Sequence, residues 1–180
     1  MRSRTLVVAA AAILALTLGT SGSARAQRAH YELFAGTAMP VGNRDLGDGF
    51  ELGAAVVRPV GIGTSDVGLV ASWTTLGATD YHSLDIIGGG VTGRYHLTVA
   101  RWRPYVSGSV GIAMPTGVGE VTHDLSTTGM VATTRAVIGF ETDVMPGVLG
   151  SIEIGYAAFP GLNYAGKMVQ YMPITARLMF

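Results

Sequence analysis

A group of side chains that could do chemistry lies between positions 80 and 85. Asp80, His82, Ser83 and Asp85 offer a base, a hydroxyl nucleophile and carboxylates, the residue types of a hydrolase or a metal site. Either kind of site needs its groups held in a fixed mutual geometry, and residues two or three apart in a loop satisfy no particular geometry. We therefore interpret Asp80, His82 and Ser83 as part of a polar loop, with Asp85 just after it.

A second group, Glu120, His123 and Asp124, carries oxygen and nitrogen ligands for a divalent cation and receives the same interpretation. The other two histidines, His30 and His96, are isolated in the sequence. The chain has no cysteine, which excludes a disulfide framework, a thiolate nucleophile and a cysteine-ligated zinc or iron–sulfur centre. The sequence therefore predicts no catalytic residue, no metal site and no cofactor.

Low charge is the most informative feature of the composition. Of the 180 residues, 13% are charged and 48% are hydrophobic, and the formal net charge is zero. Charged residues make up about a quarter of an ordinary soluble domain, so this chain must hide much of its surface from water or lie in lipid. The balanced charge excludes nucleic acid as a partner held by a basic surface, and the hydrophobic fraction excludes intrinsic disorder.

Residues 1–26 have the three parts of a secretory signal peptide. These parts are Arg2 and Arg4, an apolar run over Leu6–Leu18, and the small-x-small ending Ala24-Arg25-Ala26. The apolar run is shorter than the roughly 20 residues that a membrane-spanning helix needs. We expect cleavage near Ala26 and a single exported domain over residues 27–180.

Beyond the leader, apolar residues recur with period two and not at helical spacing. The alternation predicts eight strands, each long enough to cross a hydrocarbon layer when tilted. The expected fold is all-β, an eight-stranded antiparallel up-and-down transmembrane β-barrel. The expected strands are Tyr31–Met39, Phe50–Arg58, Val67–Thr75, Asp85–Leu97, Pro104–Met114, Met130–Thr142, Ser151–Phe159 and Met168–Phe180.

The two faces of these strands differ in their chemistry. One face is apolar, and its only formal charges are Arg58 and Asp85, both at strand ends, where a charged group can reach an interface. The other face carries charged, small and hydroxyl side chains, and Glu51 and His96 are among its polar residues. In a membrane barrel the apolar face is outward and the polar face lines the lumen. A soluble barrel or sandwich would invert this assignment, and the sequence leaves that alternative open.

Aromatic side chains gather near both ends of the expected strands, as in the two interfacial belts of a membrane barrel. This pattern predicts an interfacial belt at each end of the barrel, while alternation along the strands assigns Tyr105 and Tyr171 to the inward face. The belt at the end shared by the termini is Tyr31, Tyr95, Trp102, Tyr105, Phe140 and Phe180, and the opposite belt is Phe50, Trp73, Phe159, Tyr164 and Tyr171.

The charged residues of the inward face predict a set of ion pairs. A turn centred near Tyr164 places Glu153 opposite Thr175 and diagonal to Arg177, within reach of a long side chain. Barrel closure then brings Glu32 beside Arg177. The interior of an eight-stranded barrel is just wide enough for side chains, so such a network would plug the lumen and exclude an open diffusion pore. The hypothetical network is Glu32, Glu153, Arg177, Arg135, Glu141 and Arg94.

The last expected strand ends on an aromatic residue with apolar residues at alternate positions before it. Another segment, Arg103-Pro104-Tyr105, opens a strand of glycine-spaced small residues. In both features the chain resembles the small eight-stranded outer-membrane β-barrels of Gram-negative bacteria, of the OmpA transmembrane-domain and OmpX type. Pro173 departs from the pattern, and since proline removes a ladder donor, we expect the last strand to be bulged or only partly paired there. The residues that match the terminal pattern are Phe180, Leu178, Ala176, Ile174 and Met172.

The resemblance implies residence in the cell outer membrane of a Gram-negative bacterium, among outer-membrane lipid and lipopolysaccharide. It implies that the barrel-assembly machinery recognises the last strand. The implied role is non-enzymatic: structural support, envelope integrity, or interaction through extracellular loops whose ligand the sequence does not name.

Two other functions stay open. Lipid A deacylases are small barrels with a histidine-x-serine signature on a lipid-facing strand, whereas here His82 and Ser83 are adjacent. A soluble lipocalin-like carrier needs an apolar lumen, whereas the inward face of this chain carries glutamate and arginine.

Overall fold

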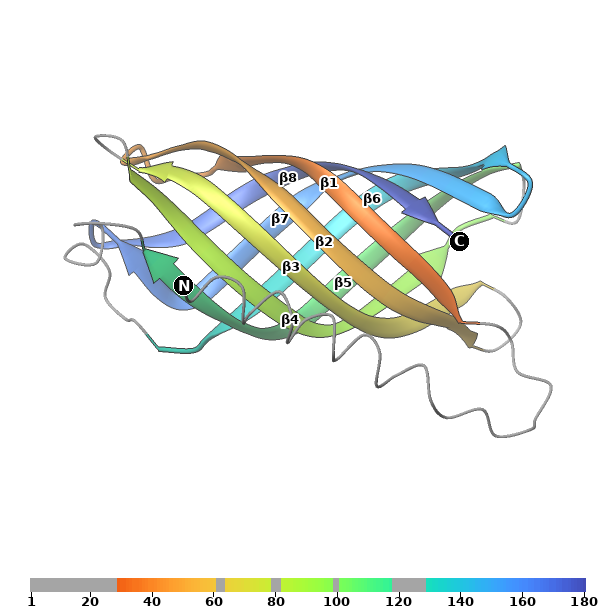
Figure 1. Cartoon of the computed structure of the whole chain (residues 1–180), viewed down its shortest axis with the longest axis horizontal. Helices are drawn as coiled ribbons and strands as arrows, with labels where there is room; N and C mark the ends of the chain where they lie inside the picture. The colour runs from red at the N-terminus through yellow and green to blue at the C-terminus, as the bar shows by residue number, and fades with distance from the viewer. Residues whose placement is uncertain (1–28, 61–63, 79–81, 99–100, 118–128) are drawn as a thin grey trace, which may run out of the picture.

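The computed structural model describes residues 29–60, 64–78, 82–98, 101–117 and 129–180. In this part of the chain, eight strands follow one another in antiparallel order and close into a single barrel (Figure 1). The predicted all-β, eight-stranded up-and-down barrel is confirmed. Among the described residues, no helix is long and apolar enough to cross a membrane. The predicted signal peptide, residues 1–26, lies outside the described residues.

Most strands are longer than predicted, chiefly at the end away from the chain termini. At that end the inward side chains are apolar as well as the outward ones, so the alternation that marks a strand in the sequence fades. One consequence is a correction: His82 and Ser83 begin a strand and do not lie in a loop. The strands are β1 (His30–Pro40), β2 (Leu46–Val60), β3 (Ser65–Ala78), β4 (His82–His96), β5 (Trp102–Gly117), β6 (Val131–Met145), β7 (Val148–Tyr164) and β8 (Lys167–Met179).

The first and last strands close the barrel. β1 pairs with β8 from Glu32 opposite Met179 to Pro40 opposite Tyr171. Beyond this ladder, Tyr31 and Phe180 exchange two backbone hydrogen bonds, at 3.1 and 2.9 Å. The even number of strands puts the start of β1 and the end of β8 at one end of the barrel, which we call the terminal end (Figure 1). The opposite end, with the turns at 41–45 and 165–166, is the loop end.

Glycines allow the wall to curve tightly where β4 and β5 pair. Gly90 lies opposite Gly111, and a Cβ on Gly111 would come within 2.1 Å of the carbonyl oxygen of Gly89. A Cβ added to Gly108, on the same strand, would lie 3.6 Å from its nearest neighbour, the carbonyl oxygen of Arg135, which is an ordinary contact. The fold therefore requires glycine at position 111 but not at position 108.

We expect Gly111→Ala to lower the free energy of unfolding by about 1–3 kcal/mol, since the methyl group forces the backbone to shift. Gly108→Ala, a chemically identical change on the same strand, should leave stability within about 0.5 kcal/mol of the wild type. The measurement is urea unfolding of each variant refolded in vesicles. Equal effects of the two substitutions would show that the crowding at Gly111 does not limit the fold.

The pairing of β8 is interrupted on one side at Pro173. The β7–β8 ladder runs to Ile154 opposite Ile174 and resumes at Ala157 opposite Tyr171, while β1 keeps its pairing with Pro173 through Ala38. The expected partial pairing of this strand is therefore confirmed. The register shift lies elsewhere, in β7 between Ala158 and Asn163.

An apolar core fills the barrel near the loop end, which the sequence did not predict. Its members include Leu76, Leu84 and Leu162, which have no exposed surface. Four aromatic residues expected in the interfacial belts are buried instead, with 1–3% of their surface exposed, and point inward: Tyr105, Phe159, Tyr164 and Tyr171. The full core cluster is Ala38, Leu46, Leu76, Leu84, Ile86, Ala113, Val131, Ala157, Phe159, Leu162, Tyr164, Val169 and Tyr171.

Candidate functional site

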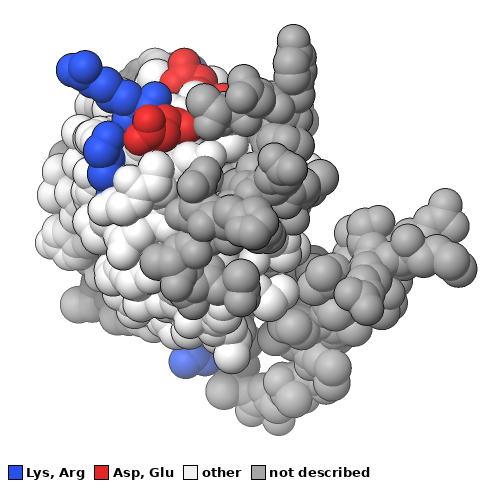
Figure 2. All heavy atoms as spheres, turned by 90° about the vertical axis from the view of Figure 1, so that its left-hand side faces the viewer, with Lys and Arg blue, Asp and Glu red and all other residues white. Residues whose placement is uncertain are grey.

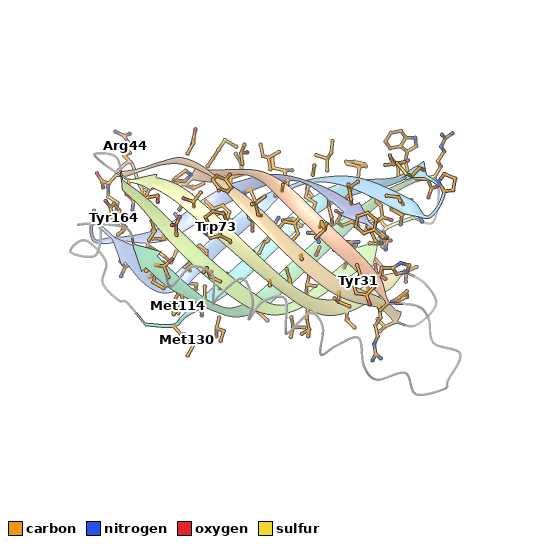
Figure 3. All side chains as sticks on the ribbon, in the orientation of Figure 1. Tyr31, Arg44, Trp73, Met114, Met130 and Tyr164 are labelled. Carbon is orange, nitrogen blue, oxygen red and sulfur yellow. The ribbon has the colours of Figure 1, made fainter. Side chains whose placement is uncertain are left out.

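The outer wall of the barrel is apolar on every strand. In the middle of the wall, Leu69, Val91 and Ile138 expose 50%, 56% and 59% of their surface. Nearer the ends, Trp73 and Tyr31 also point away from the barrel (Figure 3). The structure confirms the predicted assignment of the apolar face to the outside. The buried charged residues, which lie on the inside, are Glu32, Glu51, Arg94, Glu141, Glu153 and Arg177.

Arg177 of β8 links two buried glutamates on its neighbouring strands. Its Nη2 atom donates to Oε2 of Glu153 on β7 at 2.9 Å, and its Nη1 atom donates to Oε2 of Glu32 on β1. The register that allows this places Glu153 opposite Thr175, as the sequence predicted. Both glutamates have only 1% of their surface exposed, so the arginine supplies the positive charge that their burial requires.

Arg135 of β6 extends the ion pairs toward the loop end. Its Nη1 atom lies 2.6 Å from Oε1 of Glu51, and its Nη2 atom lies 3.3 Å from Oε2 of Glu153. Glu51 also accepts a hydrogen bond of 3.1 Å from the hydroxyl group of Tyr171. The phenyl ring of Phe34 lies between the two cations, 4.7 Å from the guanidinium of Arg177 and 5.3 Å from that of Arg135.

Arg94 of β4 extends the ion pairs toward the terminal end. Its guanidinium bridges Oε1 of Glu32 at 2.8 Å and Oε2 of Glu141 at 3.3 Å. Glu141 in turn contacts Nε of Arg103 at 3.3 Å, and Arg103 reaches Asp143 at 3.0 Å. The side chain of Asp143 is 62% exposed, so the series ends in solvent.

We call this series the ion-pair chain. Acids and arginines alternate along it, so each buried carboxylate touches at least one guanidinium. The structure brings together all six residues of the hypothetical network and adds Glu51, Arg103 and Asp143. In order from the loop end, the chain is Glu51, Arg135, Glu153, Arg177, Glu32, Arg94, Glu141, Arg103 and Asp143.

Contacts of Tyr105 and His96 with the buried acids complete the polar interior. The hydroxyl group of Tyr105 donates to Glu153 at 2.7 Å and contacts Ser151 at 3.0 Å. Near the terminal end, His96 lies between Asp66 and Glu141, with nitrogen–oxygen distances of 3.9 and 3.6 Å. Sequence reasoning placed Glu51 and His96 on the inward face but gave neither a partner. The partners of Glu51 and the Glu141 partner of His96 come from strands that are not neighbours in the sheet, and strand pairing alone does not specify those contacts. Asp66, the other partner of His96, lies on the neighbouring strand β3.

The residues considered for catalysis are not assembled into a site in the described part of the chain. Ser83 and Asp85 lie two apart on β4, opposite Gly77 and Thr75 of β3. Asp80, Glu120, His123 and Asp124 lie outside the described residues. Within the described residues, no cluster of three or more histidine, aspartate or glutamate side chains could hold a metal ion.

Charged side chains at the loop end gather along one edge (Figure 2). Lys167, at the start of β8, pairs with Asp45 of the turn between β1 and β2 at 3.2 Å. Both side chains are about half exposed, so this pair contributes about 0–1 kcal/mol to stability. Arg44 projects beyond the wall at the same end (Figure 3).

Comparison with known proteins identifies the fold through solved structures alone, because no family model and no curated protein sequence matches the chain. Neisserial surface protein A (NspA) aligns with a TM-score of 0.62 at 12% identity, over 84% of this chain and 95% of that one. The outer membrane protein OprG from Pseudomonas aeruginosa aligns with a TM-score of 0.51 at 12% identity, over 86% of this chain and 97% of that one. The architecture, the outward apolar wall and these two alignments agree: the chain has the fold of the small eight-stranded outer-membrane β-barrels.

Proposed function

We propose that the protein is an integral outer-membrane β-barrel of a Gram-negative bacterium, exported by its 1–26 leader, with a structural and non-enzymatic role. The observation that carries this proposal is the inversion of the ordinary globular arrangement. Large apolar side chains are exposed on all eight strands, while Glu32, Glu51 and Glu153 are each only 1% exposed. A wall of this kind is stable in hydrocarbon and would aggregate in water.

The lumen is closed in this proposal. The ion-pair chain occupies its middle and terminal end, and the apolar core occupies its loop end. A cavity beside Phe34, Arg135 and Arg177 measures about 10 Å³, room for a single water molecule at most. We therefore expect no steady diffusion pore, and we place the interactions of the protein on its outer wall and in its loops.

The last strand serves as the assembly signal in this proposal. Phe180, Leu178 and Ile174 are 47%, 46% and 38% exposed on the outer face of β8. Met172 and Ala176 share that face by the alternation of the strand. A continuous apolar face of this kind is available to the barrel-assembly machinery before β8 pairs with β1. Once inserted, the wall is surrounded by outer-membrane lipid and lipopolysaccharide.

The test is to express the chain with its own leader, to isolate outer membranes, and to compare boiled with unboiled samples by SDS gel mobility. The proposal predicts partition into the outer membrane and a mobility shift on boiling, because a closed barrel resists the detergent until heated. It also predicts no steady single-channel conductance in planar bilayers. A soluble periplasmic protein without a shift would instead support the lipocalin-like carrier. A change in the mass of lipid A in expressing cells would support the deacylase alternative.

A further inference from the structure

The outer wall has one hollow whose shape and surroundings point to a ligand. It measures about 390 Å³ and opens on the outward face of β4, β5 and β6. Its floor consists of Gly93, Gly108 and Ala136, which are direct cross-strand neighbours. Val91 and Val110 rise on its loop side, each more than half exposed.

The same cross-strand row continues past the floor in both directions, to two further residues that line the hollow. Val67 of β3 pairs with Gly93 at one end, and Tyr156 of β7 pairs with Ala136 at the other. The next row toward the terminal end carries Tyr95, Val106 and Ile138 in register, all large and exposed. Rows on one face of a sheet lie two residues, about 6.7 Å, apart, so the small row forms a furrow one row wide between bulkier rows.

The fold does not require glycine at the floor of this furrow. A Cβ added to Gly93 would come no closer than 3.9 Å to any atom, and one added to Gly108 no closer than 3.6 Å. Neither glycine has a positive φ angle. The crowded glycines elsewhere in the wall, such as Gly90 and Gly111, differ in this respect because a Cβ there would collide with backbone. Closure of the barrel thus explains Gly90 and Gly111 but leaves Gly93 and Gly108 unexplained.

Arg58 lies at the end of the row nearest the terminal end of the barrel. Arg58 of β2 pairs with Val67, and it is exposed two residues before β2 ends. Among the described residues, no carboxylate lies within ion-pair distance of it. An arginine at this level of a membrane wall reaches the interface and contacts lipid phosphate. The row therefore joins a cationic end at the membrane surface to an apolar furrow in the hydrocarbon.

We propose that this furrow binds one acyl chain of an anionic glycerophospholipid whose phosphate lies at Arg58, in the leaflet at the terminal end. Strands lie about 4.8 Å apart, so the five steps from Arg58 to Tyr156 span about 24 Å, an oblique path through the roughly 15 Å of one leaflet. If a methylene group takes about the 30 Å³ of a water molecule, the hollow holds about 13 methylene groups. The furrow continues the apolar wall, so the inference rests on the proposed membrane location.

The test is native mass spectrometry of the full mature protein, released from detergent micelles in the instrument. The measured quantity is the number of lipids that each protein retains, with dioleoylphosphatidylglycerol as the probe. The wild type should retain one lipid. Gly108→Leu and Gly93→Leu fill the furrow, and their Cβ atoms make no contact with backbone closer than 3.6 Å. Each should lower retention about fivefold. Arg58→Gln should lower it by a similar factor and remove the preference for phosphatidylglycerol over dioleoylglycerol, which lacks the phosphate.

Two controls make similar changes elsewhere. Ala35→Leu adds a side chain to the outward face of β1, and Arg44→Gln removes an exposed cation at the loop end; neither should change retention. Equal retention by the furrow variants and the wild type would overturn the proposal, as would a furrow-dependent preference for lipid A. A third result would also overturn it: if the wild type cross-links as a dimer and Gly108→Leu does not, with lipid retention unchanged, then the furrow binds a second copy of the chain. Gel mobility of each sample shows whether the barrel itself has formed, so failure of the membrane proposal is distinguished from failure of this one.

Discussion

Arg177→Met should lower the free energy of unfolding by about 3 kcal/mol, because it leaves an uncompensated negative charge among buried carboxylates. Arg177 contacts Glu153 and Glu32, and both would keep only one guanidinium partner. Methionine preserves much of the volume of the side chain, so the expected loss is electrostatic more than steric. The measurement is urea unfolding in vesicles, followed by tryptophan fluorescence.

Arg103→Met is the matched control at the solvent end of the same ion-pair chain. Its side chain is 27% exposed and its partner Asp143 is 62% exposed, so water can screen that carboxylate. Its other partner, the buried Glu141, keeps its contact with Arg94, and we expect a loss of about 1 kcal/mol or less. The double variant Glu32→Gln with Arg177→Met restores the original charge balance and should recover part of the lost stability. If Arg177→Met unfolds no earlier than Arg103→Met, the ion-pair chain does not stabilise the lumen.

Ile138→Arg should lower the free energy of unfolding in vesicles by about 2–4 kcal/mol, the range for a cation at the midplane of a barrel wall. Ile138 is 59% exposed near the middle of β6, so no packing within the protein opposes the larger side chain. The cost arises from lipid alone. Urea unfolding of the refolded variant measures it.

Leu97→Arg is the control for that substitution. Leu97 is 58% exposed and follows the end of β4, so an arginine there reaches the interface, where the cost falls to about 0–1 kcal/mol. A soluble barrel would tolerate both substitutions equally. Equal stability of the two variants in vesicles would therefore contradict a lipid-facing wall.

The sequence predicts which side chains face inward and which strands pair, because alternation with period two allows each strand only two face assignments. Alternation assigns Glu153 and Arg177 to the inward face, and the ladder has Glu153 opposite Thr175, as a turn centred near Tyr164 predicts. The turn itself lies at 165–166, and the register shift between Ala158 and Asn163 offsets the difference. An even number of strands lets the first and last strands pair antiparallel on closure. The furrow also follows from register, since Gly93, Gly108 and Ala136 become one row only when the β4–β5 and β5–β6 pairings are both known.

The loop end is less predictable from sequence because it lacks the contrast between faces. Leu84 and Ile86 point inward with at most 1% of their surface exposed, while Ile87 lies on the other face, so strand ends and aromatic directions there cannot be assigned from alternation. Tyr105 shows a second limit. Its position near a strand end fits an interfacial belt, but its hydrogen bond to Glu153 holds it inside the lumen.

The most direct test of the account is the orientation of the wall in a bilayer. The chain has no cysteine, so single cysteines introduced at positions 136 to 140 of β6 can each carry one spin label. In vesicles, labels at 136, 138 and 140 should be accessible to oxygen and shielded from a water-soluble nickel reagent, while labels at 137 and 139 should be immobile and shielded from both. Nickel access at 136, 138 and 140 would place that face in water and contradict the membrane barrel.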